Sequence, residues 1–169
     1  MRILHWKQSG FKTQTIRVTA DEQPVGELAL NTWSNNNAQY STGSSAFSFR
    51  TTGWLEQDII VSFEKKVVAR ATTSVMGNTK LELISGERYL LKNDGFTFNK
   101  VLQDEMGNKL VTFKQAFSLT KGTMEVSDEL DGLAGDVLIS TSLYLKALTE
   151  QQTAFLIAIC IPIFMQVIN

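Results

Sequence analysis

The chain of 169 residues has little of what most catalytic and metal sites need. It contains one histidine, His5, and one cysteine, Cys160. A single histidine leaves little from which to build a Ser-His-Asp triad or a histidine-based metal site. A single cysteine excludes an internal disulfide and a cysteine-rich metal site. Phosphate-binding signatures such as G-x-x-x-x-G-K-[ST] are also absent. We therefore expect no catalytic residues, no metal, no cofactor and no enzymatic activity.

The chain also lacks an excess of charge of either sign. The 16 Lys and Arg residues nearly balance the 17 Asp and Glu residues, which leaves a net charge of −1. No global field favours nucleic acid, so we expect no nucleic-acid partner. The opening residues, MRILHWKQSG, are too polar for a secretory signal, which predicts a cytoplasmic protein. The length and the 43% hydrophobic fraction are those of one globular domain spanning 1–169.

Proline is scarce, and its scarcity suits a protein made of β-ladders, because proline removes a ladder donor. The chain has two prolines. Short segments of alternating polarity are separated by turn residues. In one of them Ile59, Val61 and Phe63 share a face, and Glu64-Lys65-Lys66 then turns into a returning strand. About a dozen such strands follow one another, and the alternation predicts that Val137–Tyr144 is the last.

Two polar segments interrupt this pattern. The segment 31–45, NTWSNNNAQYSTGSS, reads as a long loop. It either presents Trp33 and Tyr40 to a ligand or folds these aromatic side chains back onto the wall, and the second interpretation is favoured. The segment 127–136, SDELDGLAGD, is interpreted as the last loop, because its carboxylates lack the D-x-D-x-D-G spacing of a calcium loop.

The longest apolar run lies near the C-terminus and predicts a helix at about 149–167. Thr149 and Gln152 have the spacing of a capping box, and every residue from 154 to 165 is apolar. A helix that is apolar all round is buried in a core or in a membrane. A run of roughly 10–14 residues more often belongs to a core than to a bilayer span. Pro162 predicts a kink or an early end.

Together these features predict a mainly β fold, a closed antiparallel barrel of about twelve strands around a buried hydrophobic C-terminal helix. A wall of about eight strands is filled by its own side chains, whereas one of about twelve strands can hold a helix in its lumen. The strands supply the enclosure that a fully apolar helix requires.

The chain resembles the tubby C-terminal-like superfamily, in its LURP-one-related and phospholipid-scramblase branch, as a small bacterial-type member. The resemblance is carried by ISTSLYLKALTEQQTAFLIAICIPIFMQ at the C-terminus and by hairpins such as VLQDEMGNKLVTFKQ and GWLEQDIIVSFEKKVVARATT. It implies a twelve-stranded barrel around a central C-terminal helix. Tubby proteins bind phosphoinositides through basic residues, which have no residue-by-residue match here. The proline-rich segment and cysteine clusters of scramblases are absent, so scramblase activity is not expected.

One basic cluster is a candidate site for an anion or lipid headgroup: Lys65 and Lys66 at a hairpin tip, with Arg70 on the polar side of the returning strand. A solvated hairpin end is the plainer interpretation of the same residues. We expect a non-enzymatic barrel domain that binds a phosphoinositide, another anionic lipid at a membrane surface, or a protein partner. The alternative is a tail-anchored or membrane-inserted protein whose apolar helix leaves the barrel.

Overall fold

The computed structural model describes residues 1–10, 13–31, 37–53, 56–74, 77–95, 99–115 and 120–167, and within 152–167 only the course of the backbone. The described residues form twelve strands followed by one helix. Their bounds are β1 (Arg2–Ser9), β2 (Thr13–Ala20), β3 (Gln23–Asn31), β4 (Ala38–Ser41), β5 (Ala46–Thr52), β6 (Gln57–Phe63), β7 (Lys66–Thr73), β8 (Thr79–Leu83), β9 (Arg88–Asn93), β10 (Lys100–Asp104), β11 (Lys109–Gln115), β12 (Lys121–Val126) and α1 (Gly132–Val167).

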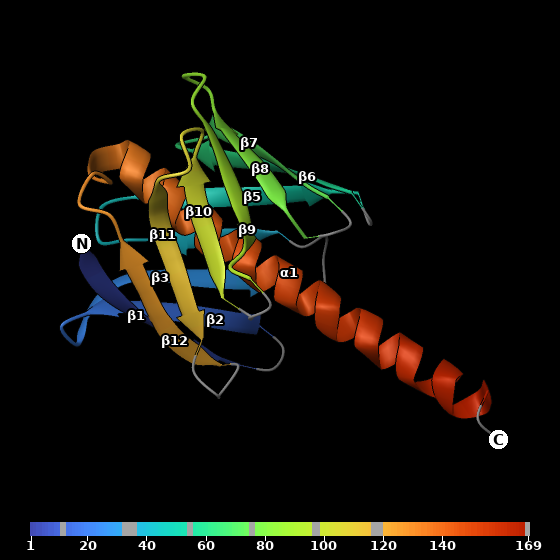
Figure 1. Cartoon of the computed structure of the whole chain (residues 1–169). Helices are drawn as coiled ribbons and strands as arrows, with labels where there is room; N and C mark the ends of the chain where they lie inside the picture. The colour runs from blue at the N-terminus through green and yellow to red at the C-terminus, as the bar shows by residue number, and fades with distance from the viewer. Residues whose placement is uncertain are drawn as a thin grey trace.

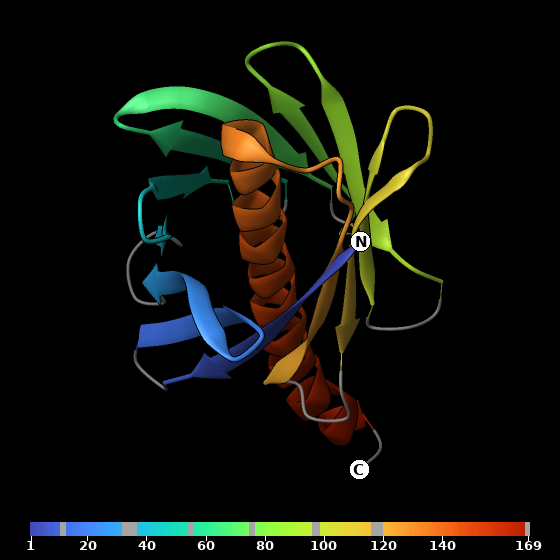
Figure 2. The same ribbon diagram turned by 90° about the vertical axis from the view of Figure 1, so that its left-hand side faces the viewer.

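The strands form a closed antiparallel barrel, as the sequence predicts. Each strand pairs with its neighbours in the sequence, and β12 pairs with β1 to close the ring. Figure 2 shows the strands arranged around α1. Side chains alternate along the wall: in β5 and β8 every second residue is buried and the others are exposed. The ring leaves no unpaired edge, because closure gives every strand a partner on both sides.

Two of the hairpins turn on residues that seldom adopt positive φ. Asp21 and Glu22 have φ of 47° and 65°, and Glu64 and Lys65 have φ of 50° and 65°. Positive φ at both central residues is the mark of a type I′ turn, whose twist matches that of the strands it joins. The turn expected at Glu64 and Lys65 is confirmed.

The predicted strand Val137–Tyr144 is wrong, because these residues lie in α1. They are buried together with the next helical turn, and the exposed fractions of Val137, Leu143, Tyr144 and Leu148 are 3% or less. The wall surrounds this part of the helix on every side, so no polar face marks it in the sequence. The enclosed helix was expected, but the residues that fill the barrel precede the longest apolar run.

The predicted helix start at Thr149 is also wrong. α1 begins at Gly132, within the segment that was expected to be the last loop. Thr149 lies in the interior of α1, where its hydroxyl donates to the carbonyl of Leu145 at 2.7 Å and does not cap the helix. The helix also continues through Pro162 to Val167, so the early end expected there does not occur.

The segment 31–45 is not wholly a loop, since it contains β4. Tyr40 of β4 is 4% exposed, which confirms that this aromatic side chain folds onto the barrel. Burial raises the pKa of its phenol to about 12. Trp33 lies outside the described residues.

Trp6 is a large inward-facing side chain whose position depends on a glycine. Its indole, 2% exposed, lies across Gly122, its partner on β12. A Cβ at Gly122 would lie 2.3 Å from the backbone oxygen of Lys114 and 2.8 Å from the Trp6 ring. Glycine is therefore required here for a close approach and not for a turn.

We predict that Gly122→Ala lowers the free energy of unfolding by about 1–3 kcal/mol, because the new methyl group overpacks the wall. Urea denaturation measures the change. Gly43→Ala is the matched control, since a Cβ there meets nothing within 4 Å, and its effect should stay within about 0.5 kcal/mol. Equal effects of the two substitutions would contradict the role assigned to Gly122.

Candidate functional site

The barrel has two unlike ends, which we call the entry end and the exit end. α1 begins at the entry end, where Arg2 donates to the carbonyl of Leu130 at 3.1 Å. It leaves at the exit end, where Gln151 Nε2 donates to Gln14 Oε1 near the start of β2 at 2.6 Å. In Figure 1 the helix continues well past the exit end of the barrel. The apolar run that starts at Ala154 therefore belongs to the part of α1 that has left the barrel.

The interior of the barrel becomes polar toward the exit end. We call the inward side chains there the polar mouth: Thr51, Gln57, Thr73, Thr79 and Lys100 on the wall, with Tyr144 and Lys146 on the helix. The hydroxyls of Thr73 and Thr79 lie 2.9 Å apart. Those of Thr51 and Tyr144 lie 2.5 Å apart, and burial raises the pKa of Tyr144 to about 12. These bonds tie neighbouring strands to each other and the helix to the wall.

Lys146 is the lysine that the helix contributes to this mouth, and it is 2% exposed. Its Nζ is 2.6 Å from Glu150 Oε1, one helical turn further on, and 3.9 Å from the centroid of the Trp6 ring. Burial lowers the pKa of Lys146, while the attraction of Glu150 opposes that shift. The carboxylate and the ring face both stabilise the charged ammonium in an interior that would otherwise disfavour it.

Lys100 is a second buried lysine, 6% exposed, at the start of β10. Its Nζ donates to Asn93 Oδ1 at 3.0 Å. Burial lowers the pKa of Lys100, Glu150 opposes the shift, and Lys146 adds to it. Two buried ammonium groups thus act on each other and on one shared carboxylate.

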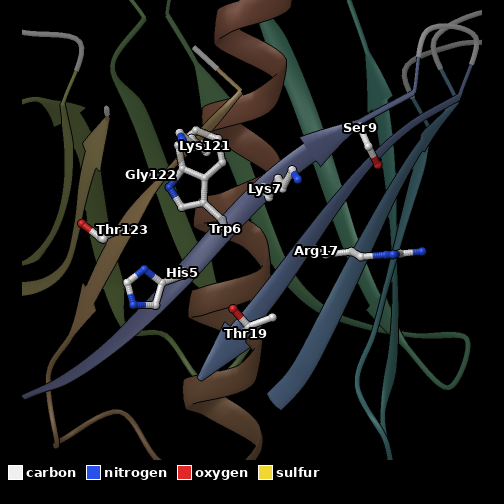
Figure 3. A pocket seen from close by; sticks show the side chains of 9 residues that line it. All are labelled: His5, Trp6, Lys7, Ser9, Arg17, Thr19, Lys121, Gly122 and Thr123. Atoms are coloured by element: carbon white, nitrogen blue, oxygen red, sulfur yellow. The ribbon is translucent and has the colours of Figure 1, made fainter. Parts of the chain in front are cut away.

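A second basic group lies on the outer face of the wall, near the same end. The register places Lys7 of β1 directly between Arg17 of β2 and Lys121 of β12. We call the hollow over these strands the basic concavity. Its volume is about 570 Å³. Figure 3 shows the residues that line it: the inward-facing Trp6 and its partner Gly122, with His5, Lys7, Ser9, Arg17, Thr19, Lys121 and Thr123.

The cations that line the basic concavity make it a candidate anion site. Arg17 Nε forms an ion pair with Glu27 Oε2 at 3.0 Å, which neutralises part of the positive charge of Lys7, Arg17 and Lys121. Like charges placed directly across neighbouring strands repel each other, and a bound anion relieves that repulsion. The hydroxyl groups of Ser9, Thr19 and Thr123 supply neutral donors beside the cations. The single histidine lies on this outer face, where it is exposed.

The structure does not bring the sequence-predicted residues Lys65, Lys66 and Arg70 to this place. Lys65 lies in the β6–β7 turn at the entry end, as expected of a hairpin tip. A bulge in β7 leaves Val68 without a register partner in β6, so Lys66 pairs with the inward-facing Phe63, whereas Arg70 pairs with the outward-facing Ile60. Paired residues share a face, so Lys66 and Arg70 point to opposite sides of the wall. Headgroup binding by these residues stays a prediction.

Neither the protein-family models, nor the curated proteins, nor the solved structures contain a match to this chain. In the described part of the chain, no three His, Cys, Asp or Glu side chains gather as metal ligands would. No helix within that same part has both the length and the apolar character that a bilayer crossing requires.

The buried lysines and tyrosines predict how the free energy of unfolding changes with pH in the alkaline range. Lys100 and Lys146 have pKa values below the ordinary 10.5 in the folded state, so between the lowered pKa and 10.5 the unfolded chain binds more protons. Stability therefore rises with pH in that window. Above about pH 10 the folded chain keeps the protons on Tyr40 and Tyr144, whose pKa values are raised from 10.0 to about 12, so stability falls.

Urea denaturation across pH 7–11 measures this profile. Lys100→Met should flatten the rise, and Tyr40→Phe should flatten the fall. Lys80→Met, an exposed position on β8, is the control and should change neither slope. A rise that is equally steep in Lys100→Met would contradict the assignment.

Proposed function

We propose that this protein is a non-enzymatic barrel domain that docks on anionic lipid membranes through the part of α1 beyond the exit end. One observation carries the proposal. The lumen is filled by Val137–Thr149, and the helix leaves the barrel before its apolar run begins. The run is therefore not needed to fill the barrel, and a helix that is apolar all round needs another apolar surrounding.

The length of the run suits one leaflet of a bilayer. From Ala154 to Met165 a helix extends about 18 Å at its rise of ~1.5 Å per residue. The hydrocarbon core of a bilayer is ~30 Å thick, so one leaflet is about half of that. Transfer of each large apolar side chain contributes about 1.5–3 kcal/mol. A few such side chains therefore supply the ~8 kcal/mol that corresponds to micromolar binding.

The basic concavity supplies the electrostatic part of docking. Lys7 lies near the end of β1 and Lys121 is the first residue of β12, and the two pair with each other. Both therefore lie toward the exit end, where the helix leaves the barrel. A basic side chain near an anionic surface contributes about 1 kcal/mol, so these residues add less than the apolar helix. We infer that the helix provides most of the affinity and that the lysines provide the preference for anionic lipid.

Membership of the tubby-like superfamily remains part of this proposal. The architecture that the resemblance implies is a twelve-stranded barrel around a C-terminal helix, and the described residues have that architecture. A protein partner that covers the apolar run is the competing occupant. The apolar run and the basic concavity lie at the same end of the barrel. This arrangement favours lipid over protein, because a membrane surface offers apolar chains and anionic headgroups side by side.

Truncation after Gln151 tests the role of the helix. The shortened chain keeps Val137–Thr149 and the Gln151–Gln14 bond, so we expect a cooperative thermal transition close to that of the full chain. We also expect it to lose co-flotation with phosphatidylserine-containing vesicles, which the full chain should show. If the shortened chain floats equally well, or if the full chain does not float, the proposal is wrong.

A full-length variant separates membrane binding from folding. Ile157→Glu with Ile161→Glu leaves the chain length unchanged and should abolish flotation without shifting the thermal transition, because neither residue belongs to the part that fills the lumen. A large loss of stability in this variant would show instead that the run is part of the core.

Paired lysine substitutions test the basic concavity. Lys7→Ala with Lys121→Ala should weaken binding to anionic vesicles about 30-fold, since two contributions of ~1 kcal/mol are lost. Binding to vesicles of phosphatidylcholine alone should not change. Lys65→Ala with Lys66→Ala removes the same charge at the entry end and is the matched control. The reverse pattern would assign the headgroup site to the β6–β7 hairpin.

A further inference from the structure

The polar mouth contains more positive than negative charge. Lys100 and Lys146 are both buried, and Glu150 is the carboxylate that acts on both of them. Among the ion pairs of the described residues, Lys146–Glu150 is the one that involves either of these lysines. Asp94, on the exposed side of the rim, pairs with Lys109 at 3.4 Å, and Asp136 lies near Arg2 toward the entry end. One ammonium group in the mouth therefore has no carboxylate of its own in the described part of the chain.

The hydrogen-bond donors of the mouth are also incompletely used. An ammonium group has three N–H donors. Within the described residues, Lys100 donates to Asn93, whereas Lys146 donates to Glu150 and rests on the face of Trp6. The Thr141 hydroxyl, more than one helical turn further into the barrel, is also buried without a partner among those residues. In the mouth itself, unused donors thus remain on the two ammonium groups.

Solvent reaches the mouth at Glu150, whose side chain is 31% exposed while that of Lys146 is 2% exposed. The carboxylate therefore stands between the exterior and the buried lysines. A small solute that reaches Glu150 is therefore close to the Lys146 ammonium, which lies 2.6 Å from Glu150 Oε1.

We propose that the polar mouth binds one oxyanion, a carboxylate or a phosphate, between Lys100 and Lys146. A buried charge without a partner is costly, and an anion that accepts hydrogen bonds from both ammonium groups removes that cost. This site lies inside the barrel and does not depend on membrane docking. Its anion comes either from free solute or from the head of an amphiphile whose chain follows α1 out of the exit end.

The competing way to remove the excess charge is loss of a proton from Lys100. Burial lowers the pKa of Lys100 and favours that outcome, whereas a bound anion favours the charged amine. The two possibilities differ in their response to added anion. A neutral Lys100 predicts no saturable effect, and an anion site predicts one.

Thermal denaturation of the full chain, without vesicles, distinguishes them. The melting temperature is measured at pH 7 in sodium phosphate, acetate and hexanoate, each against sodium chloride at equal ionic strength. We expect a saturable rise in phosphate or in a carboxylate, of about 5–10 °C once the anion is ~100-fold above its dissociation constant. A stronger effect of hexanoate than of acetate would assign the anion to an amphiphile, whereas a stronger effect of phosphate would assign it to a phosphate group.

Lys100→Met is the decisive variant. It removes the surplus charge and keeps an unbranched side chain of similar length, so it should melt at or above the wild-type temperature in chloride and lose the response to anion. Lys80→Met is the exposed control and should keep the full response. No saturable anion effect in the wild-type chain, or an effect that persists in Lys100→Met, would overturn the proposal.

A direct readout covers the case in which Lys100→Met fails to fold. Side-chain ¹⁵N resonances of Lys100 and Lys146 in the wild-type chain should both shift during the anion titration and saturate at the same concentration. Shifts restricted to exposed lysines, or a Lys100 resonance of a neutral amine that ignores the anion, would show that the mouth is not a binding site.

Discussion

Enclosure of Val137–Thr149 by a closed ring of strands is the constraint on which the rest of the structure depends. A ring of twelve strands is too wide for its own side chains to fill, so the helix is part of the core and not an addition to it. An enclosed helix has no wet side on which to place polar groups. Ser140 and Ser142 meet this constraint by donating to helix carbonyls three residues earlier. Lys146 cannot do so, and therefore needs Glu150 and the face of Trp6.

The same enclosure explains which parts of the fold could be predicted. The wall has one wet and one dry face, so its strands alternate in polarity and its hairpins carry recognisable turn residues. The closed antiparallel barrel of about twelve strands follows from that pattern, although β4 was read as a loop and Val137–Tyr144 as a strand. The helix inside has no wet face, so Val137–Tyr144 shows no helical period, and its β-branched residues read as a strand. Because the longest apolar run lies near the C-terminus, the helix was predicted at 149–167, although it begins at Gly132.

The site was less predictable than the wall because its residues meet only after the ring closes. Lys65, Lys66 and Arg70 are neighbours in the sequence, but a single bulge puts Lys66 and Arg70 on opposite faces, since one extra residue reverses the alternation. Lys7 and Lys121 lie at opposite ends of the sequence and become neighbours through the pairing of β1 with β12. No local sequence pattern predicts that contact. Lys146 is visible in the sequence as a lysine within an apolar stretch, but its partner Trp6 is not.

The distribution of polarity at the exit end is the opposite of what a purely structural barrel would require. A core that only had to be filled would be apolar inside and polar outside at both ends. Here the lumen is polar and positively charged at the end where α1 leaves, and the helix that leaves it continues as an apolar run. A buried ammonium group costs free energy unless an anion pairs with it, and a helix that is apolar all round favours an apolar surrounding. Both features lie at one end of the barrel, which the outer lysines Lys7 and Lys121 also border, so the proposed anion site and the proposed membrane contact share that end. A lipid membrane, with headgroup oxyanions above acyl chains, is the surrounding that the proposed docking would supply.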